Sequence, residues 1–170
     1  GYTLFSPKEK YNSYPTKKYL LANLIVSMGG RAAEILLYSK IMATNDNVSY
    51  SNKKIFRTIT NLDITTGASQ DLKQADNLAR SYIELFGIES FDNSQMPKMV
   101  QNPNNPYLTL SETTKTEIDD YVLYLINFAL NSALNILEAN LDEFNKLASD
   151  LVIKRSVDLK YLNQLNISYH

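Results

Sequence analysis

The longest regular pattern in the sequence is helical and extends from Ser111 to Asn140. Apolar residues recur in it every three or four positions, the spacing of one face of an α-helix: Ile118, Val122, Leu125, Ile126, Ala129, Ala133, Ile136 and Leu137. Thr114 and Glu117 have the spacing of a capping box near its start. The pattern predicts the longest helix of the chain, which Asn140 ends.

Shorter stretches with the same spacing predict further helices. The first begins after Thr16, which is expected to be its N-cap. The second ends before Gly87, where a C-cap glycine belongs. Two more follow the longest helix, over residues 141–151 and 159–165, and Ser156 is the expected N-cap of the last.

A glycine pair, Gly29 and Gly30, interrupts the first helical pattern, which covers residues 20–37. The pair has two explanations. It is either a C-cap followed by a new helix, or part of a continuing helix whose missing side chains let another backbone approach closely. The periodicity favours neither.

Strand-like residues are few. Residues 2–5 predict a short strand near the N-terminus, and a second short strand is possible around Met99, within an irregular, proline-containing connection over residues 88–110. Residues 39–63 lose the helical pattern, and their polar composition is typical of a surface loop. The sequence therefore predicts a mainly α fold with a small β element near the N-terminus.

Composition narrows the possible partners. The chain has 170 residues, enough for one domain, and its 17 Lys and Arg against 18 Asp and Glu do not suggest a nucleic-acid surface. Without cysteine it has neither disulfides nor thiolate metal sites. The most apolar stretch, residues 19–28, is too short to span a bilayer, so we expect membrane contact only through segments outside this chain.

Most catalytic signatures are missing. The sequence contains no HExxH, no Walker A motif, no GxGxxG and no GxSxG. Its single histidine, His170, is the terminal residue, which is more typical of a solvated side chain than of a ligand.

Asp71 is the strongest candidate functional residue. At the start of a helix, an acid interacts favourably with the helix dipole by roughly 0.3 to 1 kcal/mol, and this alone would explain it. However, residues 65–69 form a turn of small side chains ahead of Asp71. A carboxylate left open in this way also suits a metal ion or a substrate amide.

Several motifs together resemble the peptidase domain of the FtsH family of ATP-dependent zinc metalloproteases. They occur in the family's order and spacing over nearly the whole chain: GYT at Gly1, GGRAAE from Gly29 to Glu34, TTGASQDL from Thr65 to Leu72, ADNLAR from Ala75 to Arg80, Phe86 with Gly87, and SETTKTEIDDYV from Ser111 to Val122. The chain resembles the part of that domain that follows the catalytic helix. The motif residues concerned are Gly29, Gly30, Arg31, Glu34, Thr65, Thr66 and Gly67.

The resemblance implies a largely helical domain in a hexameric ring beneath a ring of AAA+ ATPase domains, which unfold polypeptide substrates. In the family, two histidines of HExxH hold Zn²⁺, the glutamate of that motif is the general base, and the aspartate of TTGAxxDL is the third protein ligand. That aspartate is Asp71 here. ATP would bind to a separate domain that this chain lacks.

The sequence departs from the family pattern in three ways. HExxH should lie upstream of Gly1, so we interpret residues 1–170 as a fragment that is inactive alone. Ile35 replaces a second acid after Glu34, which we interpret as a local packing change. Residues 39–63 are longer than the family's connection and predict a surface insertion.

The leading hypothesis is therefore that the chain is part of an FtsH-like zinc endopeptidase that degrades unfolded or membrane proteins. Asp71 would complete its metal site, and the helices would form its oligomerisation region. The alternative is a proteolytically inactive subunit that acts in hexamer assembly or in a protein-translocation motor. A helical interaction module without an ATPase is a third, weaker hypothesis. Family members are anchored in bacterial, mitochondrial and chloroplast membranes, and the sequence does not choose among them.

Overall fold

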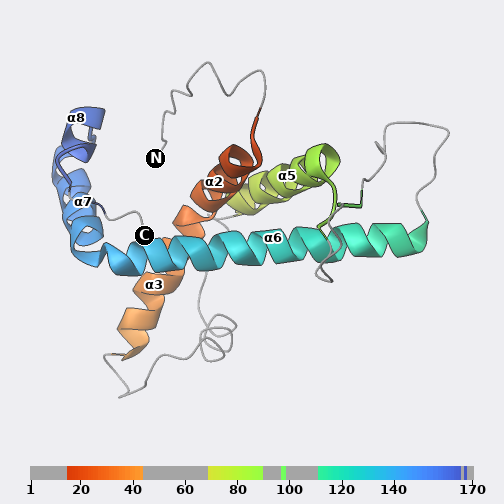
Figure 1. Cartoon of the computed structure of the whole chain (residues 1–170). Coiled ribbons are helices and arrows are strands. Elements are labelled where there is room, and N and C mark those ends of the chain that lie inside the picture. The colour runs from red at the N-terminus through yellow and green to blue at the C-terminus, as the bar shows by residue number, and fades with distance from the viewer. Residues whose placement is uncertain (1–14, 44–68, 90–96, 99–110, 166, 168–170) are drawn as a thin grey trace. The chain divides into compact units, whose positions relative to one another are not determined.

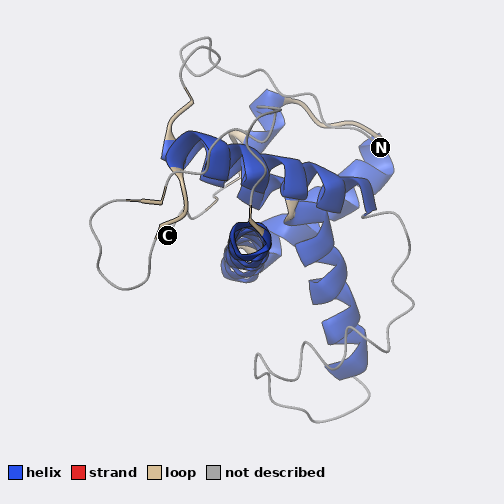
Figure 2. Cartoon of the chain, turned by 90° about the vertical axis from the view of Figure 1, so that its right-hand side faces the viewer, coloured by secondary structure: helices blue, strands red, loops and turns tan. Residues whose placement is uncertain are grey.

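The computed structural model describes residues 15–43, 69–89, 97–98, 111–165 and 167, and these are mainly helical, as predicted. The helices are shown in Figures 1 and 2: α2 (Lys17–Ser27), α3 (Gly29–Ala43), α5 (Ser69–Phe86), α6 (Glu112–Ala139), α7 (Leu141–Lys154) and α8 (Leu159–Leu162). In this part of the chain, β structure is limited to an isolated antiparallel bridge between Ile88 and Lys98. The strands predicted over residues 2–5 and around Met99 lie outside the described residues.

The chain divides into two compact units. The described part of the first contains α2, α5 and the N-terminal part of α6 up to Ala129. The second contains α3, the remainder of α6, α7 and α8.

The core of the first unit is built around the contact between α2 and α5. Ala75 and Ala79, four residues apart on α5, are completely buried, and such small side chains allow two helices to approach closely. The larger side chains that complete the buried set come from all three helices: Leu20, Leu24, Met28, Tyr82, Ile83, Tyr121, Val122 and Leu125.

Charged side chains link the elements of this unit at its surface. Arg80 on α5 donates to Asp76, at 2.9 Å, and to Asp119 on α6, at 3.1 Å. The hydrogen bond to Asp76 is the largest cause of the raised pKa of Arg80. Lys98 pairs with Glu117, which attaches the β bridge to α6. These groups are about half exposed, so each pair contributes only about 0–1 kcal/mol.

Two of the predicted helix ends are confirmed. The Oγ1 atom of Thr16 accepts the N–H of Tyr19 at 3.2 Å, the bond of an N-cap. Gly87 follows α5 with a φ of 77°, and its N–H donates to the carbonyl of Ile83 at 2.8 Å. Only glycine adopts this backbone conformation without a steric cost, which is why α5 ends there.

Two predicted caps are wrong. The Oγ atom of Ser111, not Thr114, caps α6, because it accepts the N–H of Thr114 at 3.2 Å. Similarly, Asp158 rather than Ser156 caps α8, and its Oδ1 atom accepts the N–H of Tyr161 at 2.9 Å. In both cases two residues with capping side chains lie close together in the sequence. The residue that directly precedes the first turn of the helix is the one that caps it.

The interruption at Gly29 and Gly30 matches neither explanation fully. A new helix does start at Gly29, but the residue that caps α2 is Met28, which keeps a right-handed backbone with φ −88° and ψ −3°. A Cβ atom placed on Gly29 would have no neighbour within 4 Å, so no close backbone approach requires a glycine there.

The helix α3 extends further than predicted. It continues to Ala43, into the segment of residues 39–63 that lost its apolar periodicity. No glycine or proline occurs between Arg31 and Ala43, so nothing in the sequence forces the helix to stop earlier. The remainder of the predicted insertion, residues 44–63, lies outside the described residues.

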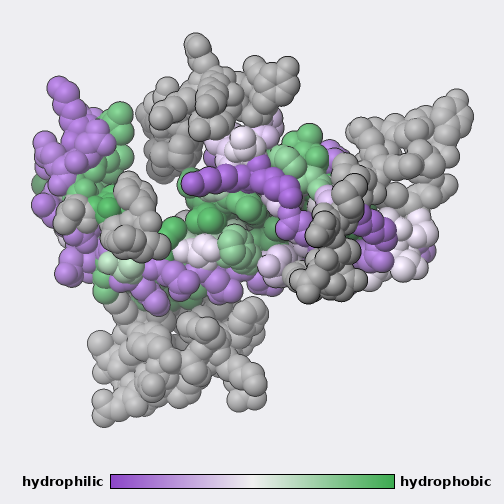
Figure 3. Space-filling model, in the orientation of Figure 1, coloured by the Kyte–Doolittle hydropathy of each residue, from purple (hydrophilic) through white to green (hydrophobic). Residues whose placement is uncertain are grey.

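In the second unit, neither α7 nor α8 has a buried residue. A hydrogen bond from Tyr161 to Asp150, at 2.6 Å, fastens α8 to α7, and the Lys154 ammonium lies 4.7 Å from the centre of the Tyr161 ring. Apolar and hydrophilic side chains lie on different sides of these helices (Figure 3).

Two helical segments, residues 17–37 and 112–139, are long and apolar enough to cross a membrane. The first is longer than the stretch of residues 19–28 considered from the sequence, because only Met28 separates α2 from α3. Core helices of soluble proteins can have the same length and apolarity, although only 28% and 22% of the two apolar windows are buried in the protein. The two segments are therefore weak indications of a membrane span.

Truncating Leu24 should destabilise the chain strongly. Its side chain is 1% exposed at the core of the first unit. Leu24→Ala should therefore lower the free energy of unfolding by about 3–5 kcal/mol, through lost apolar contacts and the cavity left behind. Urea unfolding followed by circular dichroism measures this change. Val26→Ala is the control, because Val26 is 54% exposed on the same helix. Equal losses in the two variants would contradict the assigned core.

Replacing Arg155 by glycine should stabilise the end of α7. Arg155 has a φ of 62°, in the left-handed region that favours glycine. Arg155→Gly should raise the free energy of unfolding by about 0.5–1 kcal/mol. Lys146→Gly, within α7, should instead lower it by a similar amount, about 0.5–1 kcal/mol. The prediction fails if thermal and urea unfolding show Arg155→Gly to be the more damaging change.

Candidate metal-ligand site

Asp71 lies in the first turn of α5, as the sequence predicted. It is the third residue of a helix that begins at Ser69, so its negative charge is close to the positive end of the helix dipole. Its side chain is partly exposed, whereas Gln70 and Leu72 on either side are exposed.

Any acid in the first turn would interact favourably with the helix dipole, but Asp71 also lies on a particular face of the helix. Asp71, Ala75 and Ala79 are spaced by four residues and therefore share one face of α5. Because Ala75 and Ala79 are completely buried, Asp71 continues the buried face at its N-terminal end. The Cα–Cβ bonds of a helix tilt toward its N-terminus, so this carboxylate is directed toward the start of the helix.

Asp71 fits a metal ligand in its chemistry, because a carboxylate oxygen is one of the donors that Zn²⁺ accepts. Among the residues that the structure describes, no group of three or more His, Cys, Asp or Glu side chains could hold a metal ion. Asp71 is thus a single candidate ligand in this part of the chain. The neighbouring motif residues Thr65, Thr66 and Gly67 lie outside it.

The second motif, GGRAAE, forms the start of α3. Arg31 donates to Glu34 Oε2 at 3.2 Å, an ion pair between residues three apart on one helix face. The next residue, Ile35, is only 3% exposed. An unpaired acid buried at this position would be costly, so the structure supports a local packing change at Ile35.

Tyr82 takes part in a partly buried polar contact that the sequence did not reveal. Tyr82 and Tyr121 are only 4% and 5% exposed and belong to the core. The Tyr82 hydroxyl donates to Glu89 Oε1 at 3.3 Å, and Lys17 pairs with the same oxygen. The helical spacing placed Tyr82 on the apolar face, but no local signal identified Glu89 as its partner.

These contacts change the acidity of the groups involved. Burial, and then the charge of Glu89, raise the pKa of Tyr82 to about 12. The hydrogen bond from Lys17 is the largest cause of the lowered pKa of Glu89. Burial likewise raises the pKa of Tyr121. Lys17, Tyr82 and Glu89 thus link the start of α2 with α5 and the segment that follows it, through an ion pair that is about half exposed.

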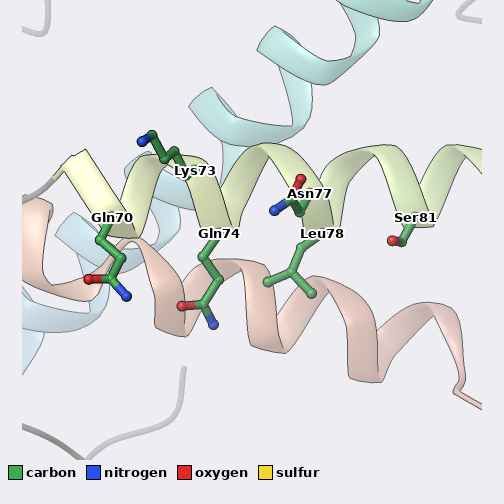
Figure 4. A pocket seen from close by; sticks show the side chains of 6 residues that line it. All are labelled: Gln70, Lys73, Gln74, Asn77, Leu78 and Ser81. Carbon is green, nitrogen blue, oxygen red and sulfur yellow. The ribbon is translucent and has the colours of Figure 1, made fainter.

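A shallow depression on α5 is a second candidate site. Figure 4 shows its lining residues, all from this one helix: Gln70, Lys73, Gln74, Asn77, Leu78 and Ser81. Gln70, Gln74 and Leu78 point toward α2 (Figure 4). The lining contains neither an acid nor a histidine that could act on Ser81, so the depression has no catalytic arrangement of its own.

Comparison with known proteins gives a consistent result. The sequence model of peptidase family M41 matches residues 49–165. The relatives include proteins named ATP-dependent zinc metalloprotease FtsH. The protein from Mycoplasma genitalium is 32% identical over 92% of this chain and 19% of its own length. The protein from Mesoplasma florum is 27% identical over 99% of this chain and 23% of its own length. The protein from Mycoplasma pneumoniae is 30% identical over 96% of this chain and 21% of its own length.

The chain thus spans about a fifth of the length of these relatives. No solved structure matches it. The matches confirm the resemblance to the FtsH family that the sequence motifs indicated.

Raising the pH above about 10 should destabilise the folded chain through Tyr82. An unfolded tyrosine loses its proton near pH 10, whereas Tyr82 keeps its proton up to a pKa of about 12. Between these values the unfolded state binds fewer protons, so the free energy of unfolding falls as the pH rises. Tyr82→Phe should show a smaller fall. Urea unfolding between about pH 9 and 11 tests this, and identical slopes in both proteins would contradict it.

Proposed function

The chain belongs to peptidase family M41, and from this we propose that it is part of an ATP-dependent zinc metalloendopeptidase of the FtsH type, with Asp71 as the third protein ligand of the zinc ion. The observation that carries the proposal is the position of Asp71, in the first turn of α5 and at the end of its buried face. The relatives named ATP-dependent zinc metalloprotease FtsH support the class of enzyme.

In this proposal the chain positions one ligand and its helix. The first turn of α5 favours the negative charge of Asp71 by roughly 0.3–1 kcal/mol, and a carboxylate must be deprotonated to bind a metal. The packing of Ala75 and Ala79 holds the helix that carries it. When bound, Zn²⁺ would polarise the peptide carbonyl and activate the attacking water. The two histidines and the general base would come from an HExxH segment that this sequence does not contain.

We also propose the assembly that the family implies. The intact protein would form a homo- or hetero-hexamer in which the helical region contributes to oligomerisation. A separate AAA+ domain would bind ATP and deliver unfolded polypeptides, including membrane proteins, to the peptidase sites. Membrane anchoring would be through segments outside this chain.

A proteolytically inactive subunit is the second candidate, and the departures from the family pattern at Ile35 and over residues 39–63 motivate it. The family pattern has an acid where this chain has the buried Ile35. Such a subunit would keep the helical domain for hexamer assembly or for a translocation motor. The segment that precedes Gly1 in the intact protein separates the two candidates, because an intact HExxH there excludes the inactive form.

Replacing Asp71 should remove the metal and the activity together. In the intact protein with its natural upstream segment, Asp71→Asn should lower the bound zinc well below one ion per chain and reduce casein hydrolysis by about 100-fold or more, because the amide supplies no anionic ligand. Metal analysis after dialysis and a casein assay measure the two effects.

Asp76→Asn is the matched control. Asp76 also lies on α5, but its carboxylate pairs with Arg80, so this variant should retain both zinc and activity. Full zinc content and full hydrolysis in Asp71→Asn would exclude the ligand role. Loss of both zinc binding and hydrolysis in the unaltered protein would favour the inactive subunit instead.

A further inference from the structure

No further inference is drawn: the strongest candidate, the exposed apolar surface patch that Leu151, Val152 and Ile153 form at the end of α7 with Leu159 at the start of α8, carries nothing because nothing in the structure shows what covers it.

Discussion

The close packing of α2 and α5 is the contact on which the first unit depends. Ala75 and Ala79 are completely buried on α5, and Leu24 on α2 and its C-cap Met28 are 1% exposed. Small side chains let the helix axes approach, and larger ones fill the remaining space at the density of a protein interior. Because α5 is a single rigid helix, the contact that holds its middle also sets the position of Asp71 at its start.

The polar contacts around this core contribute little to the free energy of folding. Their main effect is on how the helices are arranged against one another. The ion pairs of Arg80 with Asp119 and of Lys98 with Glu117 are substantially exposed, and such pairs contribute little free energy. The contact between Tyr82 and Glu89 differs, because it supplies a buried hydroxyl with the partner it needs. Burial thus provides most of the stability, and the polar groups define how the helices meet.

Asp71 has an electrostatic role at the start of α5, with which the proposed metal-ligand role is compatible. Its place in the first turn of α5 suits the helix dipole, and this role needs no other part of the protein. Its position on the same face as Ala75 and Ala79 adds what a simple capping acid would lack, a carboxylate at the edge of the core. The proposed metal site requires further ligands, and the described residues do not supply them.

The sequence by itself determined the features that depend on local spacing. The longest helix, its end at Asn140, the Thr16 cap and the glycine that ends α5 follow from residues within a few positions of one another. Asp71 was identified from its motif in the same way. Local spacing was insufficient where several residues compete for one role, as at the caps Ser111 and Asp158.

Only the tertiary structure decided which side chains are buried together and which partners they find. Tyr82 and Tyr121 are core residues. Glu89 contacts both Tyr82 and Lys17. Arg80 pairs with Asp119 on another helix. The apolar pattern of a helix repeats every three or four residues, so a short segment of the sequence is enough to show it. The partner of a buried polar group lies wherever the packing of the helices brings it, and no local pattern specifies that position.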